Sequence, residues 1–152
     1  MKKIKLGFAS DHRGYTLKQE LINYFKKQDY ILDITDCGTN SSDSCDYPDY
    51  AYLLGKAITS KEVDYGVAIC GSGIGISIAC NKVNGIRCAK VNTVLDAKMT
   101  RLDNDANVIA LSAKTNKNDA IELINTFLET NFSNEERHIN RINKIKNYEE
   151  NR

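Results

Sequence analysis

The chain has 152 residues and a formal net charge of +1, from 21 Lys and Arg against 20 Asp and Glu. Hydrophobic residues make up 41% and charged residues 27%, which is ordinary globular composition and excludes a disordered tail, a collagen-like repeat and a coiled coil. The small net charge gives no reason to expect nucleic acid or an anionic membrane as a partner. We expect a single domain that spans residues 1–152.

Strand and helix signals alternate along the chain. Short apolar runs predict strands at residues 3–9, 30–35, 64–69, 86–91 and 107–112. Apolar residues at helical spacing predict helices at residues 14–28, 49–61, 74–82, 94–102, 119–129 and 135–148. The segments 36–48 and 103–107 have the composition of polar loops. Five β/α units with short connections predict a three-layer α/β/α fold, a doubly wound parallel sheet covered on both faces.

No stretch of the sequence predicts a membrane span or a metal site. The longest uncharged run, residues 65–81, is rich in glycine and falls short of the roughly 20 apolar residues that a span needs. The basic start of the chain lacks the apolar stretch of a secretion signal. The five cysteines include no CxxC pair and no ligand spacing with the two histidines, which predicts reduced thiols. We therefore expect a cytoplasmic protein without metal or cofactor.

The residues that directly follow the strands are the candidates for a functional site, because ligands of doubly wound sheets lie beyond the carboxyl ends of the strands. They are Asp11, His12, residues 70–75, Asn92, Thr93 and residues 112–114. An aspartate beside a histidine can bind sugar hydroxyls, bind phosphate or move protons. An aspartate before a helix is equally expected to cap it.

Cys70 ends the third predicted strand and opens a turn of sequence GSGIG. Such a turn aims backbone N–H groups outward and favours an anion, and the same field stabilises a thiolate. A thiolate at an anion site can act as a nucleophile or as a general base, whereas the alternative is a structural cysteine before a tight turn. The turn is neither a P-loop nor a dinucleotide fingerprint. No arginine follows closely enough for a phosphatase-like loop.

Two arginines in the last predicted helix share one face. Arg137 and Arg141 are four residues apart, and two guanidinium groups in this arrangement can hold a phosphate. The alternative is a solvated terminal helix, because acidic and basic residues are mixed along it.

The order of these motifs resembles the ribose-5-phosphate isomerase B family, which includes the allose-6-phosphate and galactose-6-phosphate isomerases. The matching segments are SDHRG, DCGT with DYPDYA, CGSGIGISIACNK, GIR, DNDANVIAL and ERHINRI. The resemblance covers nearly the whole chain, and CGSGIGIS with DYPDYA is its most specific part. It implies a Rossmann-like sheet of five parallel strands in the order 2-1-3-4-5. It also implies metal-free interconversion of ribose 5-phosphate and ribulose 5-phosphate.

The resemblance implies how the glycine-rich turn takes part in this reaction. Cys70 is the expected base, which removes the proton from C2 so that an enediolate forms and a proton returns at C1. The Ser72 hydroxyl and the backbone N–H groups of Gly71, Gly73 and Gly75 are expected to stabilise the enediolate oxygen.

The remaining contacts to the substrate follow from the resemblance as well. The sugar is expected to meet Asp11, Asn104 and Tyr47, and the phosphate to meet His12, Arg137 and Arg141. Because the family is dimeric with each site built from both chains, the helix at residues 135–148 is expected to pack on a partner. Whether two dimers form a tetramer stays open.

The sequence departs from the family at two positions. Asp103 stands where the family usually has the histidine that opens the sugar ring. A carboxyl group could do this work if burial raised its pKa, His12 could replace it, or the ring could open spontaneously. Lys114 stands where many members have arginine, so it keeps the charge and loses bidentate geometry, and we expect it to contact phosphate.

Two other functions remain open at this point. The substrate could be a six-carbon sugar phosphate, because the sequence does not separate pocket depths that differ by one carbon. The chain could also be a phosphosugar-binding homologue with weakened catalysis. A response-regulator domain is disfavoured, because Cys70 stands where the phospho-accepting aspartate would be.

Overall fold

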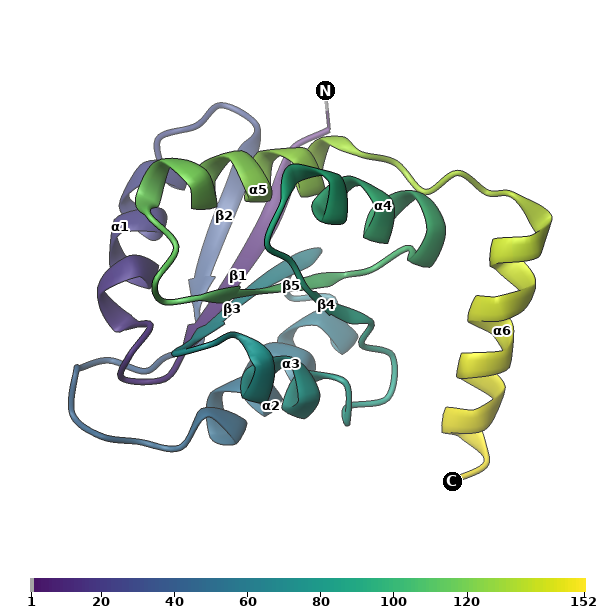
Figure 1. Ribbon diagram of the computed structural model, residues 1–152, viewed down its shortest axis with the longest axis horizontal. Coiled ribbons are helices and arrows are strands. Elements are labelled where there is room, and N and C mark those ends of the chain that lie inside the picture. The colour runs from purple at the N-terminus through teal and green to yellow at the C-terminus, as the bar shows by residue number, and fades with distance from the viewer. Residues whose placement is uncertain (1) are drawn as a thin grey trace.

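The computed structural model describes residues 2–152 and has the three-layer α/β/α fold predicted from the sequence (Figure 1). The elements in chain order are β1 (Ile4–Ser10), α1 (Tyr15–Phe25), β2 (Ile31–Asp36), α2 (Tyr47–Thr59), β3 (Tyr65–Cys70), α3 (Ile74–Cys80), β4 (Cys88–Lys90), α4 (Val94–Asn104), β5 (Val108–Ser112), α5 (Lys117–Glu129) and α6 (Glu136–Glu150). All eleven correspond to predicted elements, although β4 is shorter than expected.

The five strands form one parallel sheet in the order β2-β1-β3-β5-β4. The predicted order 2-1-3-4-5 is wrong for the last two strands, because β5 pairs with β3 and β4 forms the edge. Burial explains this arrangement. Residues 108–111 of β5 are all buried, as a strand inside a parallel sheet requires, whereas the three residues of β4 are only half-buried.

Local signals in the sequence set where several helices begin. Pro48 lies in the first turn of α2, where its missing N–H needs no partner. The side chain of Thr93 accepts a hydrogen bond from the Asp96 N–H at the start of α4, and Asn116 does the same for Asp119 in α5. Among the helices of residues 2–152, none has the length and apolar character of a membrane span.

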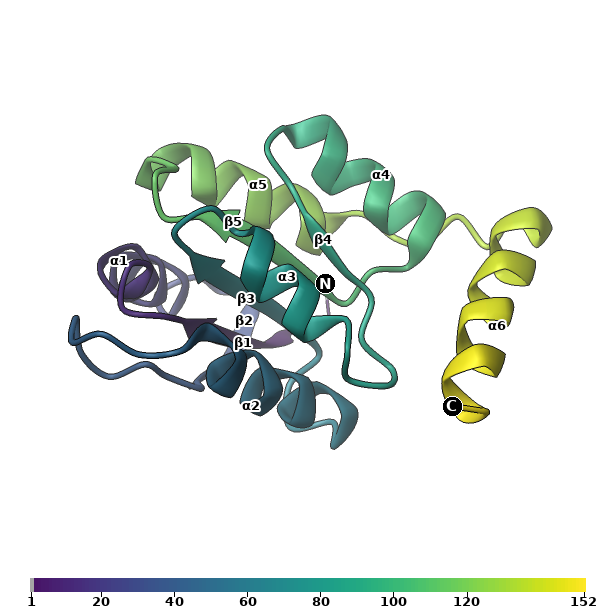
Figure 2. The same ribbon diagram turned by 60° about the horizontal axis from the view of Figure 1, so that its bottom comes forward.

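Helices cover both faces of the sheet (Figure 2). On one face α1, α4 and α5 enclose the larger apolar core, in which Phe8, Phe25 and Phe127 are fully buried. On the other face α2 and α3 enclose a second core around Leu54 and Ile76. Two cores of this size hold the sheet rigid between them, so the loops at its edges start from fixed positions.

The two edges of the sheet carry different parts of the chain. At the carboxyl edge β1, β3 and β5 end level with one another, since Ser10 pairs with Ile69 and Cys70 with Ser112. The helices run in the opposite direction, so α4 ends at the amino edge. The composition of segment 103–107 predicted a loop, and this prediction is wrong for residues 103 and 104. Helix α4 continues through Asn104 and ends at Asp105, whose backbone is left-handed with φ 46°.

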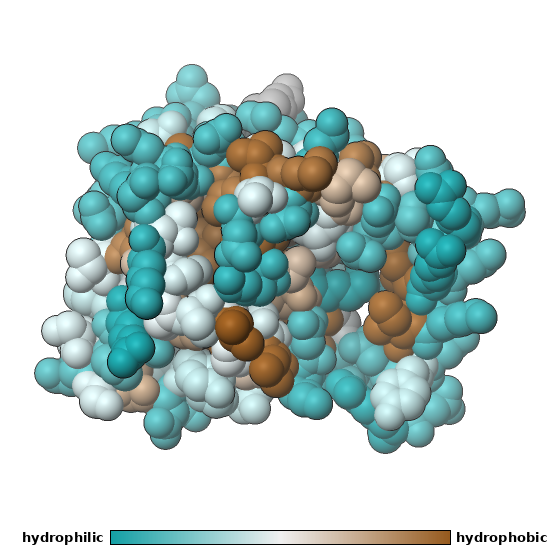
Figure 3. Space-filling view, in the orientation of Figure 1, coloured by the Kyte–Doolittle hydropathy of each residue, from teal (hydrophilic) through white to brown (hydrophobic). Residues whose placement is uncertain are grey.

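Helix α6 stands beside the sheet and not on it (Figures 1 and 2). Only His138 and Ile142 of this helix are buried. Near its end the Glu149 carboxylate accepts hydrogen bonds from the loop before β4. Ile145 and Tyr148 are 49% and 71% exposed, and apolar atoms lie along the side of the helix that faces the rest of the chain (Figure 3). This side is therefore apolar surface that one chain leaves uncovered.

Candidate active site

Cys70 lies at the carboxyl end of β3 with its sulfur turned toward the glycine-rich turn. The N–H of Gly73 donates to its Sγ at 3.2 Å, and the residue is only 4% exposed. Gly73 has φ 78°, and a Cβ on it would lie 2.9 Å from the carbonyl carbon of Leu111. Only glycine fits both the positive φ and the close approach to Leu111. The turn that this glycine allows points the Gly73 N–H at the Cys70 sulfur.

The turn that follows this sulfur carries further hydrogen-bond donors. Within residues 2–152 the backbone N–H groups of Gly71 and Gly75 have no acceptor, so they are available to a ligand oxygen. The Ser72 hydroxyl accepts from the N–H of Ile74 at 3.1 Å, which leaves its own O–H to donate. The turn thus presents several donors beside one thiol, as the sequence predicted.

The neighbouring loop after β1 positions Asp11 and His12. Asp11 is buried, and its Oδ1 accepts from the N–H groups of Arg13 and Gly14 at 3.0 and 3.1 Å. One carboxylate oxygen therefore caps the turn that starts α1, and the other is left for a ligand. His12 accepts from the Cys45 N–H through Nδ1 at 3.2 Å, which places the ring proton on Nε2.

Two more predicted residues adjoin the turn. Tyr47, in the first turn of α2, lies against Gly75, because a Cβ there would be 2.6 Å from the Tyr47 Cζ. The Ser112 hydroxyl donates to the Gly71 carbonyl at 2.8 Å and accepts from the Lys114 N–H at 3.1 Å. The loop that carries Lys114 is therefore joined to the turn, while its side chain is exposed.

Arg13 also belongs to this group, although the sequence analysis did not single it out. A Cβ on Gly71 would lie 2.9 Å from the Arg13 Cδ and 3.0 Å from its Nη1, so the guanidinium lies over the turn. Its signal in the sequence was a cation two residues after Asp11, in a loop that follows a strand. Within residues 2–152, no three His, Cys, Asp or Glu side chains come together as a possible metal site.

Two other cysteines differ from Cys70 in their surroundings. Burial raises the pKa of Cys37 from 9.0 to about 11. A contact with the Cys80 thiol, together with burial, raises the pKa of Cys88 well above 9.0. Both thiols therefore hold their protons more tightly than a free cysteine does, which disfavours either of them as a base.

Four predicted site residues lie at the opposite end of the same chain (Figure 1). Asp103 and Asn104 form the last turn of α4, at the amino edge, and Arg137 and Arg141 lie exposed on α6. Asp103 Oδ1 is 3.2 Å from Nε2 of His138, without the alignment of a hydrogen bond. One chain therefore brings together the predicted residues around Cys70 and leaves these four apart from it.

Comparison with known proteins decides the family. Residues 6–145 match a family described as ribose/galactose isomerase. The chain belongs to this family. A Rickettsia conorii protein named as a sugar phosphate isomerase is 43% identical over 96% of this chain and 100% of its own length.

Solved structures agree with the family. Ribose-5-phosphate isomerase B of Clostridium thermocellum superposes with a TM-score of 0.92 and 41% identity, over 97% of this chain and 99% of the other. Ribose-5-phosphate isomerase B of Mycoplasma genitalium, solved with bound ribulose 5-phosphate, gives 0.90 and 34% identity over 100% of both chains. This member of the ribose/galactose isomerase family is thus an aldose–ketose isomerase of the ribose-5-phosphate isomerase B type, as its motifs predicted.

Proposed function

We propose that the chain interconverts ribose 5-phosphate and ribulose 5-phosphate with Cys70 as the base. The observation that carries this proposal is the Cys70 sulfur, held 3.2 Å from the Gly73 N–H beside backbone donors without partners. A thiolate in this place is solvated by the turn, and the adjacent donors face the position where negative charge develops.

The reaction moves two protons within the substrate, one from C2 to C1 and one from O2 to O1, and needs no external oxidant. The Cys70 thiolate takes the proton from C2 of the open-chain aldose, and the C–H electron pair forms the C1–C2 double bond while the carbonyl pair moves onto O1. The thiol then returns the proton to C1, and the proton of O2 passes to O1, so that C2 becomes the ketone and C1 carries a hydroxyl. The Ser72 hydroxyl and the N–H groups of Gly71 and Gly75 stabilise the enediolate oxygen. Loss of one such donor costs about 10²–10³ in kcat.

We infer that a complete site needs two copies of the chain. Cys70 and Asp103 lie at opposite edges of the sheet, and strands of five to six residues span about 17–20 Å, which no side chain bridges. Asp103, Asn104, Arg137 and Arg141 therefore serve the partner's Cys70, the first two at the sugar and the arginines at the phosphate. The apolar side of α6 supports a partner in that position, because one chain leaves it uncovered.

Mixing two inactive variants tests the shared site. Cys70→Ala and the double variant Arg137→Ala/Arg141→Ala are each expected to be inactive. After mixing and exchange of subunits, a hybrid dimer has one intact site, so about a quarter of the wild-type activity returns for random pairing. Activity that does not return, although sedimentation shows hybrid dimers, would mean that each chain builds its site alone.

The test of the base compares two cysteine variants. Cys70→Ala should lose turnover and also lose exchange of the C2 proton in D₂O, with an unchanged circular dichroism spectrum. Cys88→Ala removes a thiol away from the site and should keep both activities. Exchange at the wild-type rate in Cys70→Ala would remove Cys70 as the base.

We propose that Asp103 opens the sugar ring from the partner's side of the site. Ribulose 5-phosphate cannot close this ring, because its C5 oxygen carries the phosphate, so the two directions of reaction separate ring opening from isomerisation. In Asp103→Asn the forward rate should stop rising with enzyme concentration, since spontaneous opening limits it, while proton exchange into ribulose 5-phosphate persists. An equal loss in both assays would place Asp103 in the isomerisation step. No loss of rate in either assay would assign ring opening to His12 or to the solvent.

The six-carbon alternative is kept because the matching family is described by both ribose and galactose. Parallel kinetics on ribose 5-phosphate, allose 6-phosphate and galactose 6-phosphate decide it, and we expect the highest kcat/KM for the pentose. Binding of ribose 5-phosphate without any C2 proton exchange would instead identify a binding protein.

A further inference from the structure

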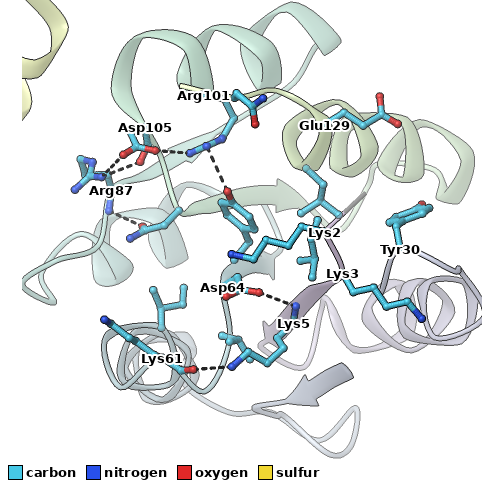
Figure 4. Close-up of a pocket in the computed structure, with 17 residues that line it drawn as sticks. Lys2, Lys3, Lys5, Tyr30, Lys61, Asp64, Arg87, Arg101, Asp105 and Glu129 are labelled. Atoms are coloured by element: carbon cyan, nitrogen blue, oxygen red, sulfur yellow. Dashed lines mark hydrogen bonds and ion pairs between the residues drawn. The ribbon is translucent and has the colours of Figure 1, made fainter. Parts of the chain in front are cut away.

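A cavity lies at the amino edge of the sheet, and none of its lining residues belongs to the site around Cys70 (Figure 4). Its volume is about 960 Å³, which is within the range of small-molecule sites. The start of β1, the loops before β3 and β4, and the ends of α4 and α5 form its walls. We propose that this basic pocket binds a nucleoside di- or triphosphate, with the polyphosphate group among its lysines.

The pocket concentrates positive charge on a chain that is nearly neutral. Six cationic side chains line it against three carboxylates, while the whole chain carries only +1. The cationic residues are Lys2, Lys3, Lys5, Lys61, Arg87 and Arg101. Charges of one sign around a concave surface reinforce one another and attract ions of the opposite sign.

The lysines of this pocket carry charge that the protein does not neutralise. Arg87 and Arg101 both contact the Asp105 carboxylate, at 3.5 and 2.8 Å. Asp64 accepts from the backbone N–H of Lys5. Within residues 2–152 none of the four lysines forms an ion pair. Ammonium groups without a carboxylate partner are suited to a phosphate group, which they bind as point charges.

Apolar surface in the same pocket favours an organic polyphosphate over an inorganic one. Ile4, Val63 and Leu128 line it together with the ring of Tyr30. The Tyr30 hydroxyl is held by Asn125, and its pKa is raised, chiefly by burial, so the ring is neutral and fixed in place. A fixed aromatic ring beside aliphatic side chains is the surface on which a base stacks.

The wall of the pocket also holds the turn that carries Asp103 and Asn104. Arg87 donates through Nε to the Asn104 carbonyl at 2.9 Å and through Nη2 to the Asp105 carbonyl at 2.8 Å. A bound polyphosphate competes with Asp105 for this guanidinium. On the proposed function, which places Asp103 and Asn104 in the partner's site, occupancy of the pocket therefore changes the isomerase rate.

Calorimetric titration of the full chain with ADP, in the absence of any sugar, tests binding. The double variant Lys2→Ala/Lys3→Ala should bind ADP at least tenfold more weakly than the wild type. Lys26→Ala/Lys27→Ala removes an equal charge from exposed lysines that do not line the pocket and should bind like the wild type. No binding to the wild type at millimolar ADP, or equal affinity of the two double variants, would overturn the proposal.

Three further titrations separate the parts of the proposal. Adenosine should bind at least tenfold more weakly than ADP, and equal binding would exclude the polyphosphate contact. Pyrophosphate should bind more weakly than ADP, and equal binding would exclude the nucleoside contact. Arg137→Ala/Arg141→Ala should leave ADP binding unchanged, because neither arginine lines the pocket. Weaker binding to this variant would mean that ADP occupies the phosphate position of the sugar site. Binding is read without turnover, so failure of the proposed isomerase function would leave these results valid.

The rate response has its own measurement. ADP should change the wild-type isomerase rate at least twofold and leave that of Lys2→Ala/Lys3→Ala unchanged. An equal response in both proteins would overturn the link from the pocket to the turn at Asn104, while the titrations still decide the binding site.

Discussion

Replacement of Gly73 by alanine should destabilise the fold and slow the reaction together. Gly73 has φ 78°, a conformation that costs an alanine about 1–2 kcal/mol. The new Cβ would also lie 2.9 Å from the carbonyl carbon and 3.0 Å from the carbonyl oxygen of Leu111. These are backbone atoms of β5 and cannot rotate away, so the contact adds about 1–3 kcal/mol of overpacking. We expect the free energy of unfolding of Gly73→Ala to fall by about 2–5 kcal/mol in total.

Gly85 provides a matched control for this substitution. Its φ of 93° is also positive, but a Cβ there would meet only the Thr59 side chain, at 3.3 Å. The free energy of unfolding of Gly85→Ala should therefore fall only by the cost of the left-handed conformation, about 1–2 kcal/mol. The difference between the two variants isolates the contact of residue 73 with the end of β5.

Urea denaturation followed by circular dichroism measures both stabilities, and the isomerase assay measures both rates. Relief of the contact moves the N–H of residue 73 away from the Cys70 sulfur, so kcat of Gly73→Ala should fall at least tenfold, while that of Gly85→Ala stays at the wild-type value. Equal stability and equal kcat in the two variants would refute the reasoning that this glycine is required by the β5 contact.

Three other perturbations have definite expected outcomes. Lys18 is fully buried with its Nζ 2.7 Å from Asp36, so Lys18→Ala should lower the urea-measured stability by about 2–4 kcal/mol, and Lys18→Met/Asp36→Leu should recover most of it. The folded chain holds the Cys37 proton more tightly than the unfolded chain, so stability should fall as pH rises from 9 toward 11, and Cys37→Ala should lose less of it over that interval. Arg13→Ala removes the guanidinium over Gly71 and should raise KM for the sugar phosphate about tenfold with little change in kcat.

Much of the fold was predictable, because the spacing of apolar residues and the positions of glycine and polar residues indicate the same helices and strands. Apolar runs bounded by glycine and polar residues marked each strand, and helical spacing marked each helix. The rule that ligands lie beyond the carboxyl ends of strands then groups Asp11, His12 and Cys70 from the sequence alone. The structure places these three at the carboxyl ends of the adjacent strands β1 and β3, with the Gly73 N–H donating to the sulfur.

Features that depend on contacts between distant segments were not predictable in the same way. The order of β4 and β5 depends on which of them pairs with β3, and both are short strands, of three and five residues. Arg13 resembles any exposed cation in the sequence, and only the absence of a side chain at Gly71 lets it lie over the turn. The end of α4 was predicted as loop because polar residues fill its last turn, and the contacts that hold this turn come from elsewhere in the chain.

Those contacts converge on one buried arginine. Arg101 is 5% exposed, and its guanidinium donates to the Asp105 carboxylate, the Ala106 carbonyl, the Thr130 carbonyl and the Tyr65 hydroxyl. A buried cation is tolerated only when its donors are satisfied, so these partners must stay in place for the chain to fold. The same requirement fixes the end of α4 against β3 and α5. The second half of the proposed site is therefore held by a satisfied charge, whereas the half around Cys70 is held by the close approach of glycine backbone to β5.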